Sequence, residues 1–99
     1  MSPKRVFFTA KIDLEGETQL TMVAGTRIVD AAIQPNGMIL LACVQPVHEH
    51  TLPFSNTRTF RVVLDGVTLG SGYFHIRSLV WQRGLVHVLE HLPLPVGPG

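Results

Sequence analysis

The stretch IVDAAIQPNGMILLACV, residues 28–44, decides the fold because it places a turn signal between two apolar runs. Asn36-Gly37 is a strong signal for a tight β-hairpin, since a type I′ turn needs positive φ at both central positions. With such a two-residue loop, Ile33 would lie opposite Leu40. The stretch therefore predicts two antiparallel strands joined by a tight turn.

Both faces of this expected hairpin are rich in apolar side chains. One face is wholly apolar, and the other still places Ala32 opposite Leu41 and Asp30 opposite Cys43. A strand that is apolar on both sides is either central in a sheet or covered on both faces. Because one small domain has few elements to supply a second cover, we expect a partner subunit to supply it and the protein to be a homo-oligomer.

Apolar residues alternate with polar ones along nearly the whole chain, and turn residues separate the alternating segments. No segment shows a convincing helical stripe. The expected fold is all-β, with six to seven short antiparallel strands in a meander-type sandwich or small barrel. The expected strands are Val6–Ile12, Thr18–Val23, Arg27–Gln34, Met38–Gln45, Thr59–Leu64, Tyr73–Gln82 and Leu85–Leu92.

The C-terminal part of the chain adds a second hairpin and a tail. A turn at Arg83-Gly84 would place Arg77 opposite Glu90 as a cross-strand ion pair. The Pro/Gly-rich segment 93–99 contains prolines that cannot donate to a ladder, so we expect a disordered tail. We therefore expect a single all-β domain over residues 1–92, followed by this tail.

Composition excludes several classes of protein. Lys plus Arg total 8 and Asp plus Glu total 7, so the chain lacks the basic excess of phosphate-driven nucleic-acid binding, and we expect no nucleic-acid partner. A hydrophobic fraction of 45% argues against intrinsic disorder. No apolar run could span a bilayer, and none near the N-terminus resembles a secretory signal. These features predict a cytoplasmic protein with no membrane partner.

Histidines raise the question of a metal site. His48 and His50 would point to one face of a strand, as zinc ligands do, but a third ligand would have to come from elsewhere. His87 and His91, on a strand, would lie ~13 Å apart, too far for one ion. The alternative is that these are loop and surface histidines. We expect no metal and no cofactor. A metal-dependent enzyme built on His48 and His50 remains an alternative function.

Catalytic constellations are equally incomplete. Ser78, His87 and Glu90 are close in sequence, but the expected pairing points Glu90 away from His87, and no nucleophile elbow is present. Cys43 sits among apolar residues and is expected in the core rather than as a reactive thiol. The sequence therefore predicts a protein that is not an enzyme.

Four segments form a pattern: an Ala-Gly turn and apolar strand (24–29), a Gly-led apolar strand ending in proline (37–46), a basic-aromatic strand (58–63), and a closing Val-His-Val-Leu-Glu (86–90). On these segments, Leu20–Glu90 resembles a family of small proteins of unknown function found in tailed bacteriophages and prophages. The chain departs from that family's tryptophan, acid and threonine at Leu41, Gln45 and Asp65. The resemblance implies a phage gene product in the cytoplasm of an infected bacterial host.

Within this context we expect a phage-encoded, non-enzymatic, homo-oligomeric binding protein that inhibits or sequesters a host component. That component would be a host protein or a small nucleotide signal, which is an argument by analogy. Because arginine binds phosphate and stacks on rings, a ligand pocket would draw on a few such groups and their neighbours. The candidates are Arg61, Tyr73, Arg77, His87 and Glu90. The alternative is a minor virion structural or assembly protein that pairs through exposed strand edges.

Overall fold

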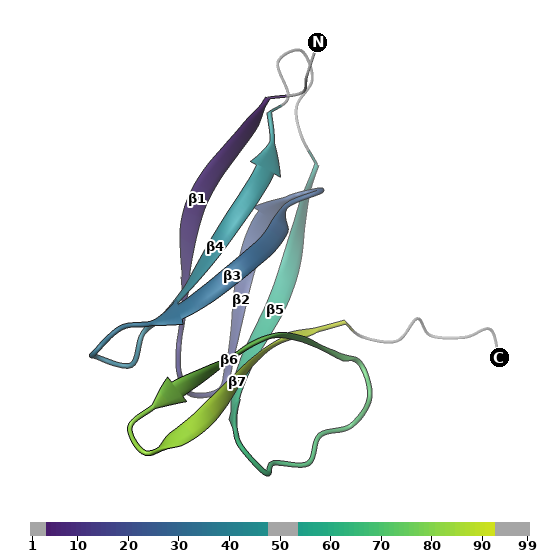
Figure 1. The fold of residues 1–99 in the computed structure, drawn as a ribbon. Coiled ribbons are helices and arrows are strands. Elements are labelled where there is room, and N and C mark those ends of the chain that lie inside the picture. The colour runs from purple at the N-terminus through teal and green to yellow at the C-terminus, as the bar shows by residue number, and fades with distance from the viewer. Residues whose placement is uncertain (1–3, 48–53, 93–99) are drawn as a thin grey trace, which may run out of the picture.

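The computed structural model describes residues 4–47 and 54–92, and these residues form strands and turns only (Figure 1). The all-β prediction is confirmed. Among the described residues there is no helix capable of crossing a membrane. The expected tail, residues 93–99, lies outside the described residues. The strands are β1 (Arg5–Ile12), β2 (Glu17–Val23), β3 (Arg27–Ile33), β4 (Ile39–Pro46), β5 (Ser55–Leu64), β6 (Tyr73–Trp81) and β7 (Gly84–His91).

Two antiparallel sheets make up the fold, a three-stranded sheet of order β1-β4-β3 and a four-stranded sheet of order β2-β5-β7-β6. Figure 1 shows β1, β4 and β3 in front of β2 and β5, with β6 and β7 crossing below. The described strands form an open sandwich and not a closed barrel. The order is not a simple meander, because β1 pairs with β4 and β2 with β5.

The core fills the space between the two sheets. Strand β4 runs through the middle of its sheet, and its alternate residues Ile39, Leu41 and Cys43 are almost completely buried. Of its other side chains, Leu40 and Ala42 are half-buried on the outer face and Val44 is buried. No other described strand packs on that outer face. The side chains with essentially no exposure are Phe60, Ile12, Ile39, Leu41, Val86, Val88 and Cys43.

The hairpin β3–β4 has a longer loop than the sequence suggested. Gln34 N–H donates to the carbonyl of Met38, Gly37 N–H donates to the carbonyl of Gln34, and only Gly37 has positive φ (91°). This is a three-residue loop with a left-handed glycine, not a two-residue type I′ turn. The expected register was therefore wrong by one residue, and Ile33 lies opposite Ile39. A one-residue slip exchanges the two faces of a strand.

The hairpin β6–β7 keeps the expected two-residue loop, but the loop lies one residue earlier than expected. Its turn residues are Gln82 and Arg83, Gln82 has φ 54°, and Gly84 already pairs with Trp81. Arg77 consequently lies opposite Val88, so the expected pairing of Arg77 with Glu90 is wrong. The physical reason is that the left-handed position falls on glutamine before the glycine, which shifts the whole ladder.

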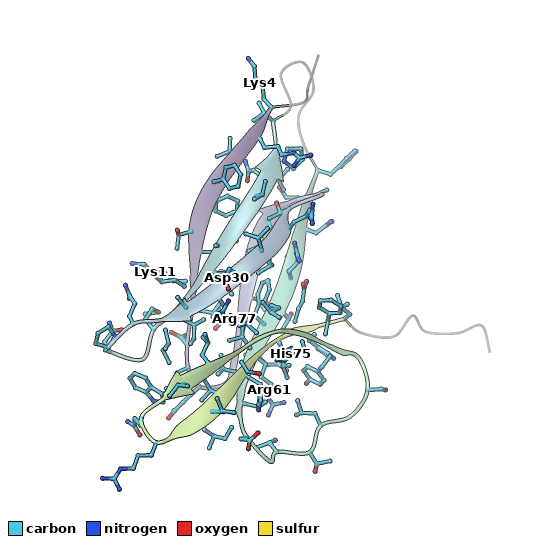
Figure 2. The ribbon with its side chains drawn as sticks, viewed as in Figure 1. Lys4, Lys11, Asp30, Arg61, His75 and Arg77 are labelled. Carbon is cyan, nitrogen blue, oxygen red and sulfur yellow. The ribbon has the colours of Figure 1, made fainter. Side chains whose placement is uncertain are left out.

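The two sheets meet along β3 and β6. Both strands carry a register irregularity, between Ile28 and Asp30 in β3 and between His75 and Arg77 in β6. Arg77 Nη1 donates to Asp30 Oδ1 across the gap, and Figure 2 shows the two side chains next to each other. The backbone N–H of Ala31 and this guanidinium both hold the pKa of Asp30 below its usual range. The pair therefore links the sheets at this edge.

Cys43 is a core residue, as expected from its apolar neighbours. Its side chain is 1% exposed, and its Sγ donates to the carbonyl of Leu41 at 3.6 Å. Burial raises the pKa of the Cys43 thiol, because the thiolate would lose its hydration there. Cys43 is therefore a packed, protonated thiol rather than a nucleophile.

Gly72 occupies a position where the fold leaves no room for a Cβ atom. It has φ 94°, and an added Cβ would lie 2.9 Å from the carbonyl oxygen of Leu92, whose N–H donates to Gly72 O. Replacement by alanine should destabilise the domain by roughly 1–3 kcal/mol, as strained backbone positions do. Urea unfolding measures this loss.

Gly66 provides the matched control for this substitution. It has φ 89°, but no atom lies within 4 Å of an added Cβ. Gly66→Ala should therefore lower the free energy of unfolding by only about 1 kcal/mol, the cost of placing a residue with a Cβ in the left-handed conformation. If the two variants lose the same stability, the close approach of Leu92 contributes nothing.

Candidate functional site

The outer face of the four-stranded sheet carries a group of polar and aromatic side chains. Paired residues of neighbouring strands point to the same side, so Val63, His87 and Ser78 form one row across β5, β7 and β6. In the neighbouring row, Arg61 of β5 and His75 of β6 lie on either side of Leu89 of β7. We call this group the outer polar face; its members are Arg61, Asp65, Tyr73, His75, Ser78, His87 and His91.

A chain of hydrogen bonds runs across this face. Ser78 Oγ lies 2.7 Å from His87 Nδ1, and His87 Nε2 lies 2.9 Å from Asp65 Oδ1. His75 Nε2 lies 2.9 Å from Ser78 Oγ. One set of tautomers satisfies all three contacts: the Nε2–H of His87 donates to Asp65, Ser78 donates to His87, and His75 donates to Ser78. The network therefore holds both imidazole rings in fixed positions.

The Ser78–His87–Asp65 chain has the order of groups found in serine hydrolases. Acyl transfer also needs donors placed to stabilise an oxyanion. Ser78 lies within a strand, and the described residues offer neither a glycine elbow nor a helix N-terminus beside it. The hydroxyl of Ser78 is also bonded to His75. The geometry thus fits fixed binding groups better than an activated nucleophile.

Beside this network, Arg61 and two rings form a second group. Arg61 Nη1 donates to Tyr73 Oη at 3.3 Å, reaching from β5 across β7 to β6. The rings of Tyr73 and His91 are stacked, with centroids 4.6 Å apart and an interplanar angle of 21°. Within residues 4–47 and 54–92, Arg61 forms no ion pair with a carboxylate. Its guanidinium therefore keeps donors available for an incoming anion.

The structure brings together three of the residues singled out from the sequence, Arg61, Tyr73 and His87. It separates the other two. Arg77 pairs with Asp30 at the junction of the sheets, and Glu90 points between the sheets. The registers of the hairpins cause this, since the expected pairing placed Arg77 and Glu90 together on one surface.

Glu90 instead forms a largely buried ion pair with Arg58. The carboxylate, 7% exposed as a residue, accepts bonds from Arg58 Nε and Nη2 at 2.6 and 2.7 Å. Arg58 Nη1 also donates to the carbonyl of Thr26 at 2.6 Å. The hydrogen bonds to Glu90 raise the pKa of Arg58. A crevice of about 300 Å³ opens here. Arg58 and Glu90 bind each other within it, and Arg27 is a third charged residue of its lining.

Sequence reasoning missed several members of the outer polar face. Asp65 could have been found from the Asp-Gly turn after β5, since the end of β5 lies beside β7. His75 and His91 needed the correct register of β6 and β7. Arg58 begins the basic-aromatic segment 58–63, but nothing in that segment indicates that its partner is Glu90.

A metal centre finds no support in the described part of the chain. There, no group of three or more His, Cys, Asp or Glu side chains is placed to hold an ion. His48 and His50, the histidines considered as zinc ligands, lie outside the described residues.

No family model, curated protein or solved structure matches this chain. The function has to be inferred from the chemistry of the outer polar face itself. That face offers a guanidinium with no carboxylate partner among the described residues, a stacked pair of rings and two oriented imidazoles on a strand scaffold.

Proposed function

We propose that this chain is a non-enzymatic binding protein that takes a small phosphate-bearing nucleotide on its outer polar face. The observation that carries the proposal is Arg61, which lacks a carboxylate partner within the described residues and lies beside the Tyr73–His91 stack. Arginine binds phosphate oxygens through paired N–H donors, and stacked rings accept a base on a flat surface.

The neighbouring hydrogen-bond network supports this chemistry. His75 and Ser78 are exposed, and their donors and acceptors are held in place by His87. The carboxylate of Asp65 is bonded to His87, which fixes the orientation of that imidazole. Figure 2 shows Arg61 and His75 on the same sheet. Groups fixed on strands lose little entropy on binding, which favours a small ligand.

The biological setting of the proposal comes from the resemblance of the sequence to small phage proteins. In that setting the protein is phage-encoded, acts in the cytoplasm of an infected bacterium, and sequesters a host nucleotide signal as a homo-oligomer. A host protein as the target is the other outcome of the test below. Sequestration needs tight binding and no turnover.

A second candidate is a minor virion structural or assembly protein. The observation in its favour is the free edge of β1, where Phe7 is 76% exposed. An uncovered strand edge with an apolar side chain can pair with strands of other chains. Detection of the protein in purified particles would favour this candidate, whereas abundance early in infection and absence from particles would favour the binding protein.

Titration with a panel of nucleoside monophosphates, diphosphates and cyclic dinucleotides tests the proposal. We expect at least one class to bind, and Arg61→Ala to weaken that binding by roughly 10- to 100-fold, the range of one charged hydrogen-bonding group. Isothermal titration calorimetry gives both affinities.

Arg83→Ala is the matched control, because it removes the same charge from an exposed turn residue distant from the ligand groups. Its affinity should equal that of the wild type. If no nucleotide binds, or if both arginine variants lose affinity equally, the proposed site is wrong. Retention of a host protein without any nucleotide would transfer the function to a protein target.

A further inference from the structure

The free edge of β1 is the most accessible pairing surface among the described strands. Strand β1 pairs with β4 along all eight of its residues without a register shift, and no described strand pairs with its other side. It contains no proline. The edges β3 and β6 are different, since both are irregular and lie against each other. A long, regular, uncovered edge is a template for another strand.

In β1, alternate residues direct their backbone N–H and C=O groups toward β4, and the residues between them direct theirs to the free edge. Val47 N–H donates to the carbonyl of Lys4, which fixes the alternation of the ladder between β1 and β4. By this alternation, the even-numbered residues of β1 bond to β4 and the odd-numbered ones face outward. The outward backbone groups are those of Arg5, Phe7, Thr9 and Lys11.

We propose that a second copy of this chain pairs with β1 antiparallel, with Thr9 opposite Thr9, so that two three-stranded sheets become one six-stranded sheet. The inference rests on the homo-oligomeric state included in the proposed function and specifies how it is built. The other edge, β2, presents polar side chains outward, whereas β1 presents the exposed ring of Phe7.

Charge complementarity selects the register. Two centres pair seven of the eight β1 residues with β1 of the second copy and keep the inner faces of both copies on the same side, one at Phe8 and one at Thr9. The Phe8 centre places Arg5 opposite Lys11 of the second copy, a like-charge pair that is destabilising. The Thr9 centre places Arg5 opposite Asp13 of the second copy, and two-fold symmetry repeats this favourable pair. The Thr9 centre is therefore the one the sequence supports.

The closing experiment uses Thr9→Cys in the full chain. Opposite residues in an antiparallel pair have Cα atoms about 5.5 Å apart, within the range of a disulfide. Mild oxidation should convert most of Thr9→Cys to a disulfide-linked dimer, seen on a non-reducing gel. Thr21→Cys, an exposed threonine midway along the free edge of β2, is the matched control and should stay unlinked. Cys43 is buried and should not contribute.

Proline substitution at the same two positions tests the backbone pairing. Ala24 N–H donates to the carbonyl of Phe54, so the N–H of Thr21, like that of Thr9, points to its free edge. Light scattering should show a dimer for wild type and Thr21→Pro, and half that mass for Thr9→Pro. A folded Thr9→Pro chain, checked by circular dichroism, that keeps the wild-type mass would overturn the proposal, as would cross-linking of Thr21→Cys instead of Thr9→Cys.

The test separates this inference from the proposed function. A monomeric wild type that still binds a nucleotide through Arg61 would remove the dimer and leave the binding protein. A Thr9-centred dimer that binds no nucleotide would support the pairing and remove the ligand proposal.

Discussion

Arg58→Met is expected to destabilise the domain by about 3 kcal/mol, a large part of the 5–15 kcal/mol that stabilises a typical domain. Glu90 accepts two hydrogen bonds from Arg58, and its side chain is 9% exposed. Methionine keeps the apolar stem of the arginine but removes the cation. The carboxylate would then be left in the interior without a partner, which is the costly outcome for a buried ion pair.

Arg77→Met is the matched control for this prediction. It breaks an arginine–carboxylate pair of the same kind, but both side chains of the Arg77–Asp30 pair are 53% exposed. Water and salt screen such a pair, so the variant should unfold close to wild type. The double variant Arg58→Met/Glu90→Leu should recover much of the lost stability, because the unpaired carboxylate is gone. Equal urea midpoints for Arg58→Met and Arg77→Met would refute the structural role given to the buried pair.

Phe60→Ala is expected to cost about 3–5 kcal/mol, the range for deleting a large buried aromatic side chain. Phe60 is fully buried between the sheets, and the guanidinium of Arg58 lies 5.8 Å from its ring centroid. The substitution removes apolar contacts from the centre of the core and leaves a cavity that rigid strands cannot close. Urea unfolding should show this loss or an unfolded chain at room temperature.

Phe54→Ala removes the same atoms from a side chain that is 85% exposed. Only a small change is expected there, since the ring is already in water. Should the two variants differ by less than about 1 kcal/mol, the core would not be centred on Phe60 as described.

The architecture could be read from the sequence to a considerable extent. Alternation of apolar and polar residues predicted each of the seven described strands to within a few residues at most ends, and the absence of helical patterns gave the fold class. The pairing order was beyond reach, because nothing local in β1 specifies that its partner is β4 rather than β2. Strand order depends on long-range packing between faces of similar composition.

Hairpin registers failed for a more specific reason. Asn36-Gly37 and Arg83-Gly84 each signal a turn, but a glycine alone does not fix the length or position of the loop. In the first hairpin, the left-handed residue Gly37 is the last of three loop residues. In the second, Gln82 takes the left-handed conformation instead of the glycine. Each one-residue error changes which side chains are opposite. This is why Arg77 and Glu90 were assigned to a common site while His75 was overlooked.

Chemical-shift mapping by NMR tests the central claim most directly, because it locates a bound nucleotide on one face of the sandwich. Adding the tightest-binding nucleotide should shift the amide signals around Arg61, Tyr73, His75 and His87 and leave those of β1, β4 and β3 in place. Shifts confined to the β1-β4-β3 sheet, or no shifts with any nucleotide tested, would contradict the account.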